Sequence, residues 1–149
     1  MDIAVAGADA RALCRRAGAG ARPFRTLAEA AGRRWDLLAL ARDAARPPCP
    51  GGLRARTLLL PGDSAPALAQ GAQALQVVGY GFSPRDTLTL SSFAGEGRLL
   101  CLQRSLLTLG GEVLEPQELP LPPALASLSG EYALLVAGLR LLSSSARCG

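Results

Sequence analysis

The 149-residue sequence contains no lysine, no histidine and no asparagine, and aromatic residues make up only 4% of it. Without histidine the chain has no imidazole base and no imidazole metal ligand. Without lysine it cannot form a Schiff base, and it lacks the side chain with which a P-loop reaches the outer phosphates of a nucleotide. We therefore predict no cofactor and no bound metal, and we favour a protein that is not an enzyme.

The four cysteines, Cys14, Cys49, Cys101 and Cys148, lie far apart and form no Cys-x-x-Cys pair. This spacing matches neither a zinc site nor a redox motif. The N-terminus has no basic segment leading into an apolar one, and the longest apolar run, Tyr132–Leu139, is too short to cross a bilayer. We expect a reduced cytoplasmic protein that does not contact a membrane.

Arginine supplies all 16 basic side chains, and its distribution is uneven. Residues 1–56 contain eleven arginines and five acidic residues (+6), whereas residues 57–149 contain five arginines and seven acidic residues (−2). A basic half fits an acidic or phosphate-bearing partner, but it equally fits arginine on solvated helix faces. Only Phe24 and Trp35 are interleaved with these arginines, which weighs against nucleic-acid binding.

The first half of the chain alternates apolar strands with helical segments. Strands are predicted at residues 2–6, 35–41, 56–60 and 76–79, and helices at residues 8–17, 26–34 and 65–74. Thr26 and Ser64 are predicted helix N-caps. Ala19–Pro23 is predicted to end the first helix, and the Pro- and Gly-rich Arg46–Gly52 is predicted to be a loop. Strands that are apolar on both faces are typical of a parallel sheet covered by helices on two sides. The predicted fold class is α/β, a Rossmann-like three-layer arrangement with a mostly parallel sheet.

After Tyr80 the pattern changes to that of a small antiparallel extension. Residues 87–91 alternate Thr with Leu, as a half-exposed strand does. Two further strands are predicted on either side of Gly110-Gly111, which is a hairpin signal, and a C-terminal helix is predicted near Gly130–Leu142. We predict a single domain, and its parts are an α/β part (1–80), a β meander (81–122, with strands at 98–109 and 112–121), a helical part (123–142) and a flexible tail (143–149).

The junction between these halves has the sequence VVGYGFSPRDTLTLSSF, Val77–Phe93. From Leu58 to Leu142 the chain resembles the latter part of the central domain of the Mur ligases, the ATP-dependent amino-acid ligases of bacterial peptidoglycan synthesis. In that family a strand ending in Asn-x-Asp-Asp is followed by a short helix, a strand leading into Tyr-Gly-Phe-Ser, a small antiparallel sheet, and a Gly-x-His-Asn-x-x-Asn turn that opens an Ala-rich helix. This chain has LLLPGDS, VVGYGFS, paired strands to LPLPP, and SGEYALLVAGLRLL in the same order. Tyr80–Ser83 is the part that matches closely letter by letter.

The chain departs from the family where the family has its chemistry. Gly7 stands for the first P-loop glycine, but Ala8–Arg11 follow in place of Gly-Lys-Thr, and Asp9 would repel a phosphate. Leu60 occupies the position of the Asn associated with adenine contacts, and Tyr132-Ala133 replace His-Asn. The resemblance therefore implies the fold without ATP-driven ligation.

The candidate ligand site is the cleft at the carboxyl ends of the strands, where open α/β sheets bind ligands. Its predicted residues follow successive strands and are Gly7, Asp9, Asp63, Ser64, Tyr80, Gly81 and Ser83. The structural alternatives are a turn with an N-cap at Pro61–Ser64 and a turn at Tyr80–Ser83. Asp86 with Arg85 could likewise form either a polar pocket wall or a turn. No catalytic residue is predicted.

Three functional hypotheses remain open at this point. The preferred one is a non-catalytic Mur-ligase-like domain that binds a small ligand or an unknown protein partner, linked to cell-wall synthesis through the resemblance. The second is a small Rossmann-type nucleotide-binding enzyme that uses the turn after the first strand, although Gly-x-Gly-x-x-Gly is missing there. The third is an assembly protein that forms homo-oligomers through an exposed sheet edge.

Overall fold

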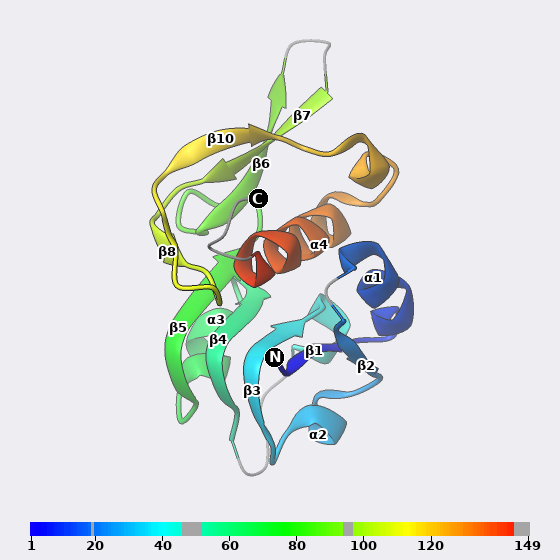
Figure 1. Ribbon diagram of the computed structural model, residues 1–149, viewed down its shortest axis with the longest axis vertical. Helices are drawn as coiled ribbons and strands as arrows, with labels where there is room; N and C mark the ends of the chain where they lie inside the picture. Colours follow the sequence, from blue (N-terminus) through cyan, green and yellow to red (C-terminus); the bar gives the residue numbers. More distant parts are fainter. Residues whose placement is uncertain (19, 46–51, 94–96, 145–149) are drawn as a thin grey trace.

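The computed structural model describes residues 1–18, 20–45, 52–93 and 97–144 (Figure 1). Residues 46–51 of the predicted loop and 145–149 of the predicted tail lie outside the described residues, as do Cys49 and Cys148. The described strands form one sheet of eight strands and a separate pair of strands. The predicted α/β fold class with a mostly parallel sheet is confirmed.

The parallel part of the sheet consists of five neighbouring strands. They are β1 (Ile3–Ala6), β2 (Arg22–Phe24), β3 (Arg34–Leu40), β4 (Arg54–Pro61) and β5 (Gln73–Tyr80). Their spatial order is β5-β4-β3-β1-β2, so the chain moves from β1 to β2 on one side and then returns to the other side of β1 with β3. This doubly wound order places the topological switch point between the carboxyl ends of β1 and β3.

The antiparallel extension continues the same sheet beyond β5. It contains β6 (Leu88–Phe93), β7 (Gly97–Leu102) and β10 (Gln117–Pro120), while β8 (Leu106–Leu107) and β9 (Val113–Leu114) pair separately. The hairpin around Gly110-Gly111 is confirmed, but the two long strands predicted beside it are each broken in two. One break follows Leu102, where the Gln103 side chain donates a hydrogen bond of 2.6 Å to the Asp86 carbonyl. The other break contains Pro116, which has no backbone N–H to donate to a neighbouring strand.

Helices cover both faces of the sheet (Figure 1). The helices α1 (Ala10–Ala17) and α4 (Gly130–Ser143) contribute to one apolar core, and the short helices α2 (Leu27–Ala30) and α3 (Ala65–Ala69) contribute to a second core on the other face. Two single turns of 3₁₀ helix, η1 (Arg42–Ala44) and η2 (Pro123–Leu125), lie in the connections. The apolar strands β1, β3 and β4 are buried between these layers, as their sequences predict.

Helices α2 and α3 are shorter than predicted. Each ends just before a glycine with positive φ, Gly32 (83°) after α2 and Gly71 (79°) after α3, a conformation that ends a helix readily. The Thr26 N-cap is confirmed, because Glu29 N donates to its hydroxyl and the Glu29 carboxylate accepts from Thr26 N. The predicted cap at Ser64 is wrong, since its side chain makes no capping hydrogen bond.

Strand β5 also differs from its prediction as a strand buried on both faces. Leu75 is 82% exposed and Val77 is 39% exposed. The reason is that α3 has only five residues, and β5 is followed by the loop 81–87 instead of a helix that could cover it. A second error concerns the segment Ala19–Pro23, because Arg22–Phe24 forms the edge strand β2 beside β1.

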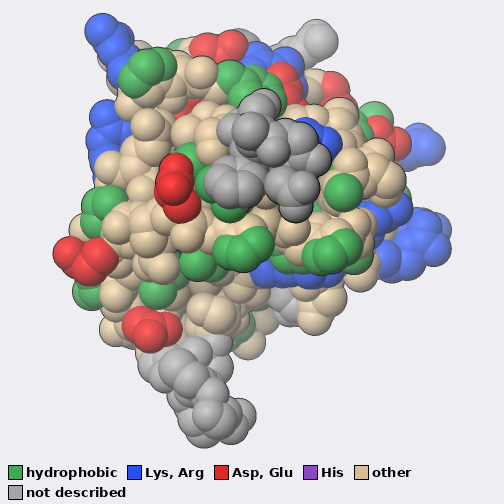
Figure 2. All heavy atoms as spheres, turned by 90° about the horizontal axis from the view of Figure 1, so that it is seen from above, with side chains coloured by type: hydrophobic (Ala, Val, Ile, Leu, Met, Phe, Trp, Pro, Cys, Tyr) green, Lys and Arg blue, Asp and Glu red, His purple; other side chains and the backbone are tan. Residues whose placement is uncertain are grey.

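The two edges of the large sheet are short. Edge strand β2 has three residues including Pro23, and edge strand β10 has four residues including Pro120. Short edges that contain proline discourage the addition of another strand. Seen from the end that carries β6 and β7, the surface shows acidic and basic side chains interspersed among hydrophobic ones (Figure 2). Among the described residues, no helix combines the length and apolar composition that a membrane span requires.

Candidate functional site

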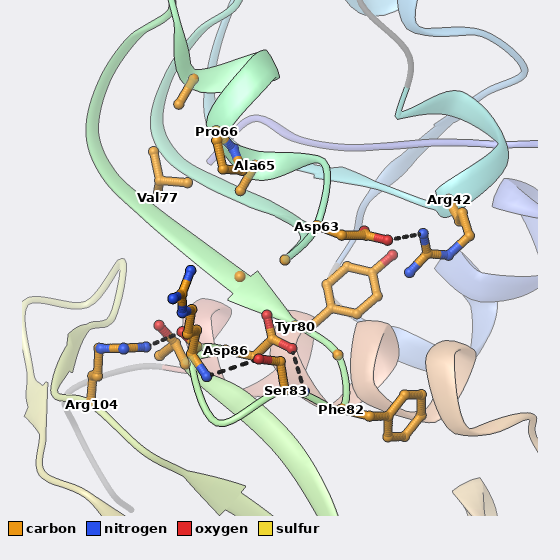
Figure 3. Close-up of a pocket in the computed structure, with 16 residues that line it drawn as sticks. Arg42, Asp63, Ala65, Pro66, Val77, Tyr80, Phe82, Ser83, Asp86 and Arg104 are labelled. Carbon is orange, nitrogen blue, oxygen red and sulfur yellow. Dashed lines mark hydrogen bonds and ion pairs between the residues drawn. The ribbon is translucent and has the colours of Figure 1, made fainter.

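A cavity of about 790 Å³ opens at the carboxyl ends of β4 and β5 (Figure 3). One wall is apolar and consists of Ala65, Pro66 and Ala69 from α3 together with Val77 from β5. This wall exists because the loop after β5 leaves the strand uncovered beyond α3.

The opposite wall carries two arginines. Arg85 lies in the loop between β5 and β6, and Arg104 lies in the loop between β7 and β8. The guanidinium of Arg104 donates to the backbone carbonyl of Arg85, which holds the two loops together. Neither arginine forms an ion pair within the described part of the chain. Both positive charges are thus available to a ligand.

Asp86 closes the cavity on the side of the strand ends. Asp86 is 6% exposed, and its Oδ2 accepts a hydrogen bond from the Ser83 backbone N–H at 2.9 Å. The Pro84–Asp86 turn therefore forms and also contributes to the wall of the cavity. The Asp86 carboxylate lies against Gly62, Gly79 and Gly81, and a Cβ atom on Gly62 would overlap Asp86 Oδ1. The absent side chains of these glycines make the space that the carboxylate fills.

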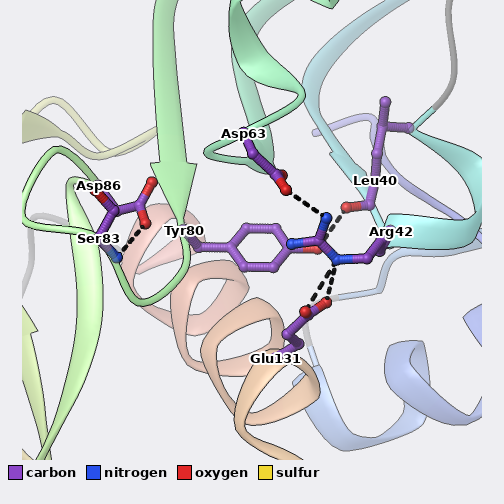
Figure 4. Close-up of polar contacts among 7 residues, drawn as sticks. All are labelled: Leu40, Arg42, Asp63, Tyr80, Ser83, Asp86 and Glu131. Carbon is purple, nitrogen blue, oxygen red and sulfur yellow. Dashed lines mark hydrogen bonds and ion pairs between the residues drawn. The ribbon is translucent and has the colours of Figure 1, made fainter.

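Arg42 joins the ends of three elements beside this cavity (Figure 4). Its Nη1 lies 2.7 Å from Asp63 Oδ2, and its Nε lies 2.9 Å from both carboxylate oxygens of Glu131 at the start of α4. The hydrogen bond from Arg42 lowers the pKa of Asp63, and the bonds to Asp63 and Glu131 raise the pKa of Arg42. Asp63 is therefore already paired with Arg42.

A neighbouring cavity of about 600 Å³ shares Arg42 and Phe82 with the first.

Tyr80 has a structural role at the site. Its side chain is 1% exposed, and its hydroxyl donates to the Leu40 carbonyl at 2.7 Å, which ties the end of β5 to the end of β3 (Figure 4). Desolvation by burial raises the pKa of the phenol. The ring forms part of the cavity wall, while the hydroxyl is already used within the protein.

The switch point between β1 and β3 is filled by acidic side chains of the protein. Asp43 Oδ2 accepts the Ala8 N–H at 2.8 Å, at the turn where a phosphate would bind in a dinucleotide-binding fold. Asp9 Oδ2 accepts the Tyr132 hydroxyl at 2.5 Å, and this bond raises the pKa of Tyr132 to about 12. A phosphate at this turn would meet negative charge and an amide that is already bonded.

The structure brings together part of the predicted site. Asp63, Tyr80, Gly81 and Ser83 line the large cavity, whereas Gly7, Asp9 and Ser64 do not. Sequence reasoning missed the contributions of Arg42 and Arg104. Arg42 directly follows a predicted strand, so its position was a usable signal, but nothing local to Arg104 indicates that its loop returns to the end of β5.

The charged side chains that line the cavity are three arginines and two aspartates. The described cysteines, Cys14 and Cys101, are not among its lining residues, and burial raises the pKa of the Cys14 thiol to about 11. Within the described residues, no group of three acidic, cysteine or histidine side chains could hold a metal ion. The arrangement offers an apolar wall, two guanidinium groups that have no acidic partner among the described residues, and a buried carboxylate.

Comparisons of the chain with protein-family models, with curated proteins and with solved structures found no significant match.

Proposed function

We propose that this protein is a non-catalytic binding module, and that its ligand occupies the cavity at the carboxyl ends of β4 and β5. The observation that carries the proposal is the pairing of an apolar wall with two arginines that have no acidic partner among the described residues. A concave, largely apolar site with a few polar groups is the usual form of a small-molecule site. The ligand that fits is a small molecule with an apolar body and an anionic group.

Each part of the ligand has a partner in the cavity. Its anionic group faces Arg85 and Arg104, whose guanidinium forks suit carboxylate or phosphate oxygens. Its apolar body contacts Pro66 and Val77. The exposed ring of Phe82, at the border with the neighbouring cavity, offers a planar surface for stacking.

We further propose that the module is a relative of the Mur ligase central domain with a role linked to cell-wall synthesis. The support is the order of elements from β4 to α4 around the Tyr80–Ser83 sequence. The hypothesis of a Rossmann-type enzyme is disfavoured, because Asp43 and Asp9 fill the switch point. Assembly through a sheet edge is disfavoured by the short, proline-containing strands β2 and β10.

Thermal unfolding in the presence of candidate ligands tests the proposal. Magnesium–ATP, ADP, NAD and UDP-linked sugars at millimolar concentration provide anionic groups joined to planar or less polar bodies. A ligand present at about 100 times its Kd adds about 2.7 kcal/mol to the free energy of unfolding, which raises Tm by several degrees.

Matched arginine variants locate the binding. We expect the shift to disappear in the double variant Arg85→Gln/Arg104→Gln and to persist in Arg15→Gln, which removes one charge from the exposed face of α1. A shift that survives the double variant would place the ligand elsewhere and contradict the proposed site. If no anionic ligand raises Tm, the nucleotide and sugar-nucleotide classes are rejected.

A further inference from the structure

A second cavity with arginines lies at the opposite, amino-terminal end of the parallel sheet. It has a volume of about 390 Å³ and is lined by Arg34 at the start of β3, Arg54 at the start of β4 and Gln73 at the start of β5. Arg34 and Arg54 are direct neighbours in the register of the two strands, and Arg54 is the neighbour of Gln73. Three long polar side chains therefore begin side by side on adjacent strands.

Arg34 and Arg54 have no acidic partner among the described residues. Both are exposed, and neither forms an ion pair with an acidic residue in the described part of the chain. Arg54 Nη2 donates to the Gly32 carbonyl at 3.1 Å, and its remaining N–H groups find no further acceptor in the part of the chain that the structure describes. Two like charges on neighbouring strands repel each other, so an anion bound between them would lower their electrostatic repulsion.

Other side chains nearby explain why this pair is left unpaired. Arg33 lies 3.6 Å from Asp2 and stacks at 4.5 Å on the ring of Trp35. Asp36 accepts the Asp2 backbone N–H at 2.8 Å. The acidic groups at this end of the sheet are thus engaged with partners other than Arg34 and Arg54.

We propose that this amino-end cavity binds a phosphate monoester. Two guanidinium groups carry a charge of +2, and a phosphate monoester carries about −1.5 to −2 at pH 7 with three acceptor oxygens. Arginine forks match these oxygens in pairs. The remaining lining is apolar, with Ala55, Ala74 and the 82% exposed Leu75, and it provides a surface for the organic part of the ester. This site is separate from the cavity proposed above and does not depend on it.

Calorimetric titration with phenyl phosphate tests the site, with benzoate as a singly charged probe that has the same ring. At fixed ionic strength we expect phenyl phosphate to bind at least tenfold more tightly than benzoate. Arg34→Gln and Arg54→Gln should each weaken binding at least tenfold, and the double variant should abolish it. Arg15→Gln, which makes the same charge change on α1, should bind as the wild type does. Leu75→Ser should reduce the affinity for phenyl phosphate to that for inorganic phosphate.

The pH dependence and the cavity variants make the test decisive. Affinity should fall between pH 7.5 and pH 5, because the dianionic ester takes up a proton near pH 6 and becomes a monoanion. Arg85→Gln/Arg104→Gln should leave the affinity unchanged, which separates this site from the one at the carboxyl ends. Equal affinity for benzoate, or an equal loss in Arg15→Gln, would overturn the proposal. The proposal would also be overturned if a single-stranded oligonucleotide bound more tightly than phenyl phosphate and Arg15→Gln weakened that binding as much as Arg34→Gln and Arg54→Gln do. That result would indicate diffuse polyanion binding. Circular dichroism and a cooperative melt establish that each variant is folded.

Discussion

Tyr80, Asp86 and Arg42 show how single polar side chains join strand ends that are distant in the sequence. Tyr80 donates to the Leu40 carbonyl, Asp86 fills the space beside Gly62, and Arg42 spans Asp63 and Glu131. The buried contacts of Tyr80 and Asp86 are costly to break because their partners are removed from water. The Arg42 ion pairs are about half exposed and contribute little to stability, and Arg42 lines both cavities.

Removal of the Tyr80 hydroxyl is expected to destabilise the protein. Tyr80→Phe leaves the Leu40 carbonyl without this donor, and an unsatisfied buried group costs about 1–3 kcal/mol. Urea unfolding measures the change. Tyr132→Phe serves as the control, because it removes a hydroxyl from a less buried tyrosine and should cost less at neutral pH. Equal losses in the two variants would contradict the structural role of the Tyr80 hydroxyl.

The space between Gly62 and Asp86 can be tested by a double substitution. Gly62→Ala introduces a Cβ that overlaps the Asp86 carboxylate, and overpacking of this kind costs about 1–3 kcal/mol. Asp86→Ala frees the same volume at the expense of the hydrogen bond from Ser83 N. The combined variant should therefore lose less free energy of unfolding than the sum of the single variants. Additive losses would show that the carboxylate and the Cβ do not compete for space.

Three side chains with raised pKa values make stability fall at alkaline pH, namely Cys14, Tyr132 and the buried Tyr80. The pKa of Cys14 is raised from 9.0 to about 11 by burial, and that of Tyr132 is raised from 10.0 to about 12, chiefly by its bond to Asp9. Because the folded state holds these protons more tightly, the stabilisation is complete below about pH 9 and is lost as pH rises through 9–12. The free energy of unfolding of Tyr132→Phe should decline less steeply above pH 10 than that of the wild type. An identical slope would contradict the Tyr132–Asp9 contact.

At the scale of elements, local signals explain where helices begin, and packing explains how far they extend. The Thr26-x-x-Glu29 sequence forms its capping box as predicted, since both partners lie within one turn. Helix α4 is long because its residues from Ala133 to Leu139 are buried against the sheet. The short α3 leaves β5 uncovered, and this shortness creates the apolar wall of the candidate site.

The caps of α2 and α3 provide a matched pair for mutation. Thr26→Ala removes the hydroxyl that accepts from Glu29 N and should cost about 0.5–2 kcal/mol. Ser64→Ala at the start of α3 should change the free energy of unfolding little, because the Ser64 side chain makes no capping bond. Chemical denaturation of both variants measures the difference. Similar losses would indicate that Ser64 caps α3 in solution.

At the scale of the whole molecule, one sheet lies between two apolar cores. The first core contains residues of α1 and α4, and the second contains residues of α2 and α3. Strands β1, β3 and β4 contribute side chains to both cores, so neither core can unfold without exposing the other. We expect the protein to unfold as a single cooperative unit.

Trp35 allows this cooperativity to be measured. It is the sole tryptophan, is 1% exposed and belongs to the second core. Its fluorescence should follow the same urea transition as far-UV circular dichroism, to which α4 in the first core contributes. Two separate midpoints would contradict a single unit, and a lower midpoint for the fluorescence would indicate that the core beneath α2 and α3 opens first.

The sequence by itself determined the features that depend on neighbouring residues. Apolar runs specify β1, β3 and β4, Gly110-Gly111 specifies a hairpin, and Thr26 with Glu29 specifies a cap, because each signal acts within a few residues of chain. The absence of lysine and the acidic turn after β1 likewise indicated that no P-loop forms. These are properties of composition and local geometry.

Only the tertiary structure decided which distant side chains meet. Arg104 reaches Arg85 because the β7–β8 connection returns to the end of β5, and Arg42 meets Glu131 because α4 begins above the end of β3. Arg34 and Arg54 become neighbours through strand register. They lie 20 positions apart in the sequence, and no local sequence pattern indicates that they meet. Such contacts are set by the order and registry of strands, which depend on packing of the whole sheet. Both binding proposals rest on this information.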